Sequence, residues 1–122
     1  MNLRISDLIA MQQELQAAHP NWGGVTPERG RNQLLWSICE LGEVIDIIKK
    51  RGDDEIMNNP ETRHHFVEEM ADVMMYLTDV MLCYGITAEE YSEVHARKHA
   101  HNMKRNWTEE IAHMFDDKEY PR

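Results

Sequence analysis

The sequence predicts an all-α protein, with a protomer that resembles a four-helix bundle. Two observations lead to this prediction. Apolar residues recur at helical spacing in long segments, and prolines, glycines and capping residues mark the breaks between them. No stretch alternates apolar and polar residues over the length of a strand. A chain of 122 residues suits one domain with one core, so we expect a single domain over 1–122.

The first two expected helices lie on either side of a Gly/Pro-rich stretch. Ser6 is a candidate N-cap for a helix that ends near Ala18, before a proline. The stretch 21–30 is expected to be a loop, and a second helix is expected over 31–51. Its apolar residues fall at i, i+4, i+7, i+11 and i+14, which predicts a core-facing stripe: Leu34, Ile38, Leu41, Ile45 and Ile48.

A polar loop is expected at 53–59, before the third helix. Asn59 and Pro60 are typical of an N-cap and a first helical position, and the helix is expected to extend to about Tyr84, with Gly85 after its end. Its apolar stripe is again wide: Phe66, Val67, Met70, Val73, Met74, Leu77 and Met81. Because four short helices hide little apolar surface, symmetric association into a homodimer or homotetramer is expected.

The fourth helix is expected to begin after Thr87. Thr87 and the glutamates that follow it form a capping box, and the helix should run to about Arg105. The remainder, 106–122, is expected to be a polar C-terminal tail with one short helix near 109–114.

Acidic residues outnumber basic ones, 22 against 13, which gives a formal net charge of −9. This charge disfavours nucleic acid polymers and anionic membranes as partners, because both attract basic surfaces. It leaves open a small phosphorylated ligand that binds through a metal cation.

The two cysteines, Cys39 and Cys83, show no metal-binding spacing. We expect them to be buried thiols in a reducing compartment. The N-terminus has no apolar signal-peptide core, and no apolar run approaches the ~20 residues of a membrane span. A cytoplasmic protein is therefore expected.

Two acidic pairs stand on the second and third expected helices. Glu40 and Glu43 are three residues apart, as are Glu69 and Asp72, so each pair lies on one helix face. Antiparallel packing of the two helices would bring the pairs together, and four carboxylates need a counterion. Oxygen donors suit Mg²⁺ or Mn²⁺. Acidic pairs are also common on solvated helix faces, and spacing alone leaves both interpretations open.

The pattern Glu40-x-x-Glu43, a spacer of 25 residues, then Glu69-x-x-Asp72 resembles the MazG-like all-α nucleoside triphosphate pyrophosphatases. The resemblance covers about 5–107. Four further places support it: the lead-in 31–35, the segments 39–46 and 68–77, and the pattern Lys98-x-x-x-Asn102-x-x-Arg105.

This resemblance implies hydrolysis of a (d)NTP to (d)NMP and pyrophosphate, with Mg²⁺, or Mn²⁺ in its place. Glu40, Glu43, Glu69 and Asp72 would be both the catalytic residues and the metal ligands. One carboxylate would accept the proton of the water that attacks the α-phosphorus. The candidate substrate-binding residues are Lys98, Asn102, Arg105, Tyr76, Trp22, Asn32 and Lys50. Relatives that prefer deoxycytidine triphosphates have Trp where this chain has Lys50, so the base preference stays open.

Two alternatives accompany the enzyme hypothesis. One is a non-catalytic helical module that binds nucleotides or a partner. The other is a carboxylate-bridged di-iron bundle, because Glu61-x-x-His64 and Glu110-x-x-His113 have Glu-x-x-His spacing. The second is disfavoured, since these motifs lie near the ends of expected helices and the acidic pairs lack histidine partners.

Overall fold

The computed structural model describes residues 1–114. Within them the chain forms six α-helices and one 3₁₀ turn, without a strand, so the predicted all-α class is confirmed. The chain divides into two compact units, Met1–Ala88 and the part from Glu89 onward, and each is described by itself. None of the described helices combines the length and the apolar character needed to cross a membrane.

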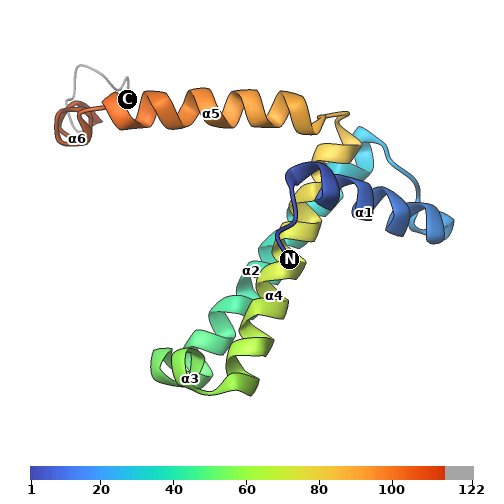
Figure 1. Cartoon of the computed structure of the whole chain (residues 1–122), viewed down its shortest axis with the longest axis horizontal. Coiled ribbons are helices and arrows are strands. Elements are labelled where there is room, and N and C mark those ends of the chain that lie inside the picture. Colours follow the sequence, from blue (N-terminus) through green and yellow to red (C-terminus); the bar gives the residue numbers. More distant parts are fainter. Residues whose placement is uncertain (115–122) are drawn as a thin grey trace, which may run out of the picture. The chain divides into compact units, whose positions relative to one another are not determined.

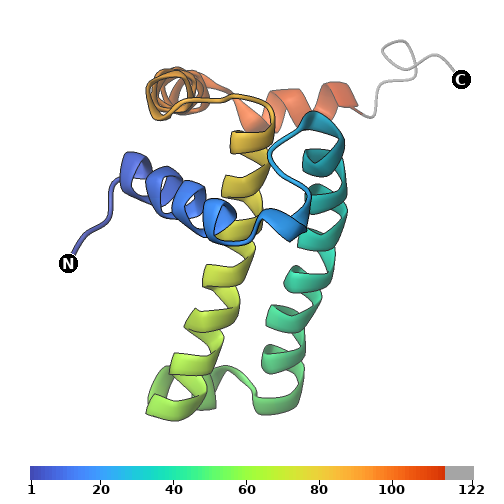
Figure 2. The ribbon, with the colours of Figure 1, turned by 90° about the vertical axis from the view of Figure 1, so that its right-hand side faces the viewer.

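The first unit is an antiparallel hairpin with a third helix packed against it. The hairpin consists of α2 (Pro27–Arg51) and α4 (Pro60–Cys83), which lie side by side in Figures 1 and 2. The short α3 (Asp53–Asn58) joins them at one end. The N-terminal α1 (Ile5–Ala18) packs on α4 and is followed by the turn η1 (Pro20–Trp22).

The beginning of α2 lies four residues earlier than position 31, where the sequence placed it. Thr26 is the N-cap, and its Oγ1 accepts a hydrogen bond from the Arg29 N–H at 3.3 Å. Pro27 occupies the first helical position, where its missing N–H costs nothing. The Thr-Pro start signal lies inside the Gly-rich stretch, so composition predicted a loop where local capping begins a helix.

The first helix also begins earlier than predicted. Ile5 is its first residue, so Ser6 lies inside the helix and is not the N-cap. Arg4 takes that position, and its backbone N–H donates to Asp7 Oδ2 at 2.8 Å. A carboxylate in the first turn satisfies one free N–H and interacts favourably with the helix dipole.

The predicted loop at 53–59 is wrong over most of its length, because α3 occupies it. Three acidic residues stand in the first turn of α3, which favours helix over loop through the helix dipole. Ile56 anchors the helix, since it is buried within an otherwise polar segment. Polar composition alone therefore misled the prediction.

The predicted limits of α4 are confirmed. Asn59 is the N-cap, and its side chain accepts from the Glu61 N–H at 3.0 Å. At the other end Gly85 has a φ of +70°, the left-handed conformation that glycine adopts without strain. The Ile86 N–H then donates to the Met81 carbonyl at 2.9 Å, which completes a Schellman motif.

The second unit contains α5 (Ala88–Lys104) and α6 (Trp107–Met114). The predicted fourth helix is confirmed to within one residue at its C-terminal end, and so is a short helix in the expected tail. The rest of that tail, 115–122, lies outside the described residues.

The predicted core-facing stripe of α2 does not face the core of this unit. Its five members, Leu34, Ile38, Leu41, Ile45 and Ile48, are 41–63% exposed. The α2 residues buried in this unit are instead mainly small or polar: Gly30, Gln33, Ser37, Val44 and Ile47. A hairpin can bury one face of each helix, and here α2 buries a mixed face that holds Val44 and Ile47 beside small and polar residues.

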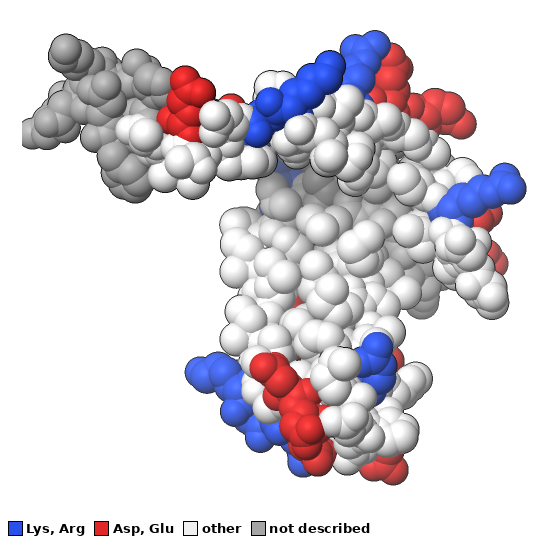
Figure 3. Space-filling model, turned by 60° about the vertical axis from the view of Figure 1, so that its left-hand side comes forward, with Lys and Arg blue, Asp and Glu red and all other residues white. Residues whose placement is uncertain are grey.

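The outer surface of the hairpin is correspondingly apolar. Figure 3 shows a face whose middle part carries almost no charged side chains, above the charged end at which α3 lies. On α4, too, several members of the expected core stripe are 40–54% exposed: Val67, Met70, Met74 and Leu77. Of the two thiols expected to be buried, Cys83 is buried and Cys39 is exposed.

Candidate functional site

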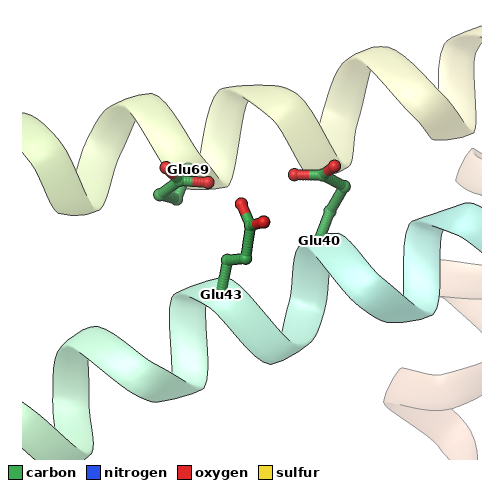
Figure 4. A group of neighbouring side chains, drawn as sticks. All are labelled: Glu40, Glu43 and Glu69. Carbon is green, nitrogen blue, oxygen red and sulfur yellow. The ribbon is translucent and has the colours of Figure 1, made fainter.

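Three of the four predicted carboxylates converge between α2 and α4. Glu40 and Glu43 project from α2 toward Glu69 on α4, and Figure 4 shows their side chains in the space between the helices. One carboxylate oxygen from each lies within 4.8 Å of the others. The hairpin creates this cluster, because antiparallel packing places the acidic face of α2 opposite the acidic face of α4 at the same height along the helices. Exposed acidic clusters are common without an ion, so proximity alone does not make a metal site.

Glu69 contributes a buried oxygen to the cluster. Its side chain is 16% exposed, and Oε2 is buried with no hydrogen-bond partner in the described part of the chain. The pKa of Glu69 is raised, first because a proton shared with Glu43 would satisfy both carboxylates, and then because of burial. His65 lies one turn away, with Nδ1 3.9 Å from Glu69 Oε1, and opposes the rise.

The pKa of Glu40 is raised as well, by burial first and then by the charges of Glu43 and Asp72. Asp72 thus adds its charge to the cluster from α4, although it is not among the three converging residues. Tyr76 stands one turn beyond Asp72. Burial, followed by the charges of Glu40 and Asp72, raises the pKa of its phenol.

A groove of about 590 Å³ adjoins the cluster at the α3 end of the hairpin. Glu43 and Glu69 line it, and so does Lys50, one of the predicted substrate-binding residues. The Lys50 ammonium is 3.5 Å from Asp46 Oδ2, in an exposed pair that contributes little to stability. The groove therefore places cationic and anionic side chains along one wall.

Two further predicted residues, Trp22 and Tyr76, line a partly open cavity of about 240 Å³ together with Asp72. Trp22 also lines a neighbouring groove of about 460 Å³ together with Asn32. Its indole stacks on the His19 ring, with centroids 4.1 Å apart and planes 10° from parallel. An aromatic platform thus stands beside the cavity that contains Asp72.

Lys98, Asn102 and Arg105 belong to the second unit, and their approach to the carboxylates stays a prediction. Arg105 Nε donates to Glu110 Oε2 at 2.5 Å, and its guanidinium lies 3.7 Å from the centroid of the Trp107 ring. These contacts hold the guanidinium in place against α6.

Sequence reasoning missed a buried polar network centred on Asp79. Its carboxylate accepts hydrogen bonds from three glutamine amides, Gln12 and Gln16 on α1 and Gln33 on α2, at 2.9–3.1 Å. Arg29 supports it by donating to Gln16 Oε1 at 2.6 Å. The i, i+4 spacing of the two α1 glutamines was the available signal, but glutamine on a helix usually faces solvent.

The residues of the di-iron alternative do not join the cluster. His64 Nε2 is 2.8 Å from Glu68 Oε1, and both side chains are largely exposed. The side chain of His113 lies outside the described residues.

Comparison with known proteins leaves the chain without an assigned family. No protein-family model matches it, and neither a curated protein nor a solved structure does.

Proposed function

We propose that the chain is a Mg²⁺-dependent nucleoside triphosphate pyrophosphohydrolase of the MazG-like kind. It would convert a (d)NTP to (d)NMP and pyrophosphate, a reaction suited to cleansing the nucleotide pool. The observation that carries the proposal is the meeting of Glu40, Glu43 and Glu69, from two acidic motifs 25 residues apart in sequence, between facing helices. The buried oxygen of Glu69, which is unpartnered within the described part of the chain, supports this interpretation beyond proximity alone.

The donor set fits a hard divalent cation. All the donors are carboxylate oxygens, and Glu69 Oε2 is buried without a hydrogen-bond partner among the described residues, as an oxygen reserved for a cation would be. Glu40, Glu43, Glu69 and Asp72 would hold Mg²⁺ or Mn²⁺. When bound, the ion supplies positive charge that neutralises phosphate oxygens and makes a water molecule more acidic.

The side chains of the chain have separable roles in this proposal. One of the four carboxylates would accept the proton of the attacking water. Lys50 would stabilise negative charge on the phosphates along the groove that it shares with Glu43 and Glu69. On the second unit, Lys98, Asn102 and Arg105 would bind phosphates.

The nucleoside would lie on the other side of the acidic cluster. Trp22 and Tyr76 line the cavity that contains Asp72, so a base there could stack while its sugar approaches the carboxylates. Asn32 lines the adjoining groove with Trp22. The residues that line the groove and the cavity therefore favour one orientation of the nucleotide, with its phosphates toward Lys50 and its base toward Trp22.

Product analysis tests the reaction. The purified chain is incubated with Mg²⁺ and each canonical ribo- and deoxyribonucleoside triphosphate, and the products are separated by chromatography. We expect monophosphate and pyrophosphate from at least one nucleotide, with no turnover in EDTA. Orthophosphate with a diphosphate would overturn the mechanism. No turnover of any nucleotide would favour the non-catalytic module.

Two neighbouring glutamates provide a matched pair of variants. Glu69→Gln removes a carboxylate from the cluster and should lower kcat/KM by at least ~100-fold, because a proposed ligand of the metal ion is lost. Glu68→Gln removes a charge from the exposed pair with His64 and should stay within about twofold of the parent. Equal activities of the two variants would show that the cluster is not the catalytic centre.

A further inference from the structure

Asp79 is a buried carboxylate whose surroundings determine how three amides are oriented. It is 5% exposed, lies on the inner face of α4, and forms no ion pair with any residue in the described part of the chain. An ionised carboxylate can only accept hydrogen bonds. The three glutamines around it must therefore turn their NH₂ groups toward it, and none can rotate by 180° without bringing two oxygens together: Gln12, Gln16 and Gln33.

This constraint also determines where the amide oxygens point. The Oε1 of each glutamine lies on the side of its amide away from Asp79. Gln16 Oε1 accepts from Arg29 at 2.6 Å and is satisfied. Within residues 1–114, Oε1 of Gln12 and Oε1 of Gln33 receive no hydrogen bond from the protein. Two acceptors thus remain whose direction the buried carboxylate imposes.

The same two glutamines line the cavity of about 240 Å³, whereas Gln16 does not. The other walls include the rings of Trp22 and Tyr76, apolar surface from Met75, the carboxylate of Asp72 and the guanidinium of Arg29. Nη1 of that guanidinium already donates to Gln16 Oε1 and to the Gly24 carbonyl. A pocket with flat and apolar walls and with oriented acceptors suits a planar ring that carries hydrogen-bond donors.

On the basis of the proposed function, we propose that Asp79 is a positioning residue. By orienting the amides of Gln12 and Gln33, it makes this cavity select nucleobases that carry an exocyclic amino group. Cytosine and adenine can donate from that group, whereas uracil and hypoxanthine place a carbonyl oxygen at the same position. A base with a carbonyl oxygen at that position would bring this oxygen against the Oε1 of a glutamine. Two acceptors cannot form a hydrogen bond, so both oxygens would stay unpaired. Sites built for a hydrogen-bond donor discriminate strongly against analogues that lack it.

Binding of monophosphates tests this selection without any hydrolysis. Calorimetric titration of the full chain compares dCMP with dUMP, and AMP with IMP, two pairs that differ at the amino or oxo position. We expect the amino member of each pair to bind at least ~10-fold more tightly, which is what one hydrogen bond is worth. Equal affinities, or tighter binding of dUMP and IMP, would overturn the proposal. A failure to release pyrophosphate in the separate turnover assay would overturn the proposed function alone.

Three glutamine variants separate recognition from packing. Gln12→Met and Gln33→Met each remove a lining amide at nearly constant volume and should reduce the amino preference about tenfold. Gln16→Met removes an equally buried donor to Asp79 that does not line the cavity, so it should lower thermal stability while the preference stays. The same loss of preference in all three variants would show a structural role only.

Asp79→Asn gives a readout that a purely structural residue would not produce. Asparagine keeps the shape of Asp79 but has one accepting oxygen, so one neighbouring amide must rotate. Gln33 is the single donor to Oδ2, and its rotated amide would present Nε2 to the cavity. The dCMP to dUMP affinity ratio should then fall at least ~10-fold, partly because dUMP gains affinity. A parallel loss of both affinities would contradict the proposal.

Discussion

At the scale of single residues, the carboxylate cluster is a source of strain in the folded protein without a cation. Burial, followed by the charges of Glu43 and Asp72, raises the pKa of Glu40 above its ordinary value, and a hydrogen bond with Glu43, followed by burial, raises the pKa of Glu69. Each group therefore binds its proton more tightly in the folded state than in the unfolded chain. The proton serves as a substitute for the counterion that the cluster needs.

The pH dependence of stability follows from this difference. The contribution is fully present below pH 4.5 and is lost as pH rises through the two folded-state pKa values. In EDTA, we expect Tm to fall as pH increases through this window. Glu43→Gln should flatten that slope and raise Tm by a few degrees at pH 7, because it removes the shared repulsion.

The measurement is thermal unfolding followed by circular dichroism between pH 4 and 8. Glu68→Gln is the control, since Glu68 lies in an exposed pair with His64 outside the cluster. A slope that Glu43→Gln and Glu68→Gln leave equally unchanged would show that the cluster does not govern this pH dependence.

The acidic cluster could be anticipated from the sequence, whereas the Asp79 network could not. Residues at i and i+3 share a helix face whatever the helix packs against, so the spacing of Glu40 and Glu43 was informative by itself. The Asp79–Gln12 hydrogen bond joins residues 67 positions apart. Nothing local distinguishes a glutamine that faces a buried carboxylate from one that faces water.

At the scale of elements, α2 presents two faces with different uses. Periodicity correctly predicted a helix, but it assigned the apolar stripe to the hairpin interface, where small and polar side chains lie instead. Ser37 Oγ donates to the Leu34 carbonyl of its own helix, and Thr78 Oγ1 on α4 donates likewise to Met74. Because each hydroxyl donates its hydrogen bond within its own helix, it needs no partner on the facing helix, and the two helices can pack closely there. Hydrophobic periodicity cannot indicate which face meets which neighbour.

Gly30 marks the closest approach of α2 to the end of α4. A Cβ at this position would lie 2.8 Å from Cys83 Cβ and 2.9 Å from Tyr84 Cε2, both closer than atoms can pack. Although alanine is normally the better helix former, Gly30→Ala should destabilise the protein by about 1–3 kcal/mol, because the helices must separate. Denaturant-induced unfolding measures the change.

Gly42 provides the matched control on the same helix. Nothing lies within 4 Å of a Cβ built there, so Gly42→Ala should stabilise by about 0.5–1 kcal/mol through the lower entropy of the unfolded chain. Changes of the same sign at the two glycines would contradict the close packing that the structure places at Gly30.

At the scale of the whole molecule, the unexplained feature is the outer apolar surface of the hairpin. Monomeric proteins rarely expose contiguous apolar patches as long as the α2 stripe from Leu34 to Ile48. The sequence prediction of a homodimer or homotetramer addresses this surface. Within the first unit, α1 packs on α4, and the only helices whose backbones lie close to α2 are α4 and the short α3.

We expect the protein in solution to have a mass that is a multiple of the 14.4 kDa chain, with the α2 stripe buried between copies. The double variant Ile38→Asp/Ile45→Asp should shift it toward 14.4 kDa and lower Tm, because burying two carboxylates in an apolar interface is strongly unfavourable. Met11→Asp alters an exposed apolar residue on α1 and should keep the assembly intact. Sedimentation velocity at several concentrations distinguishes these outcomes. A parent protein that sediments as a single chain at all concentrations would contradict the prediction, and an assembly that survives the double variant would place the interface elsewhere.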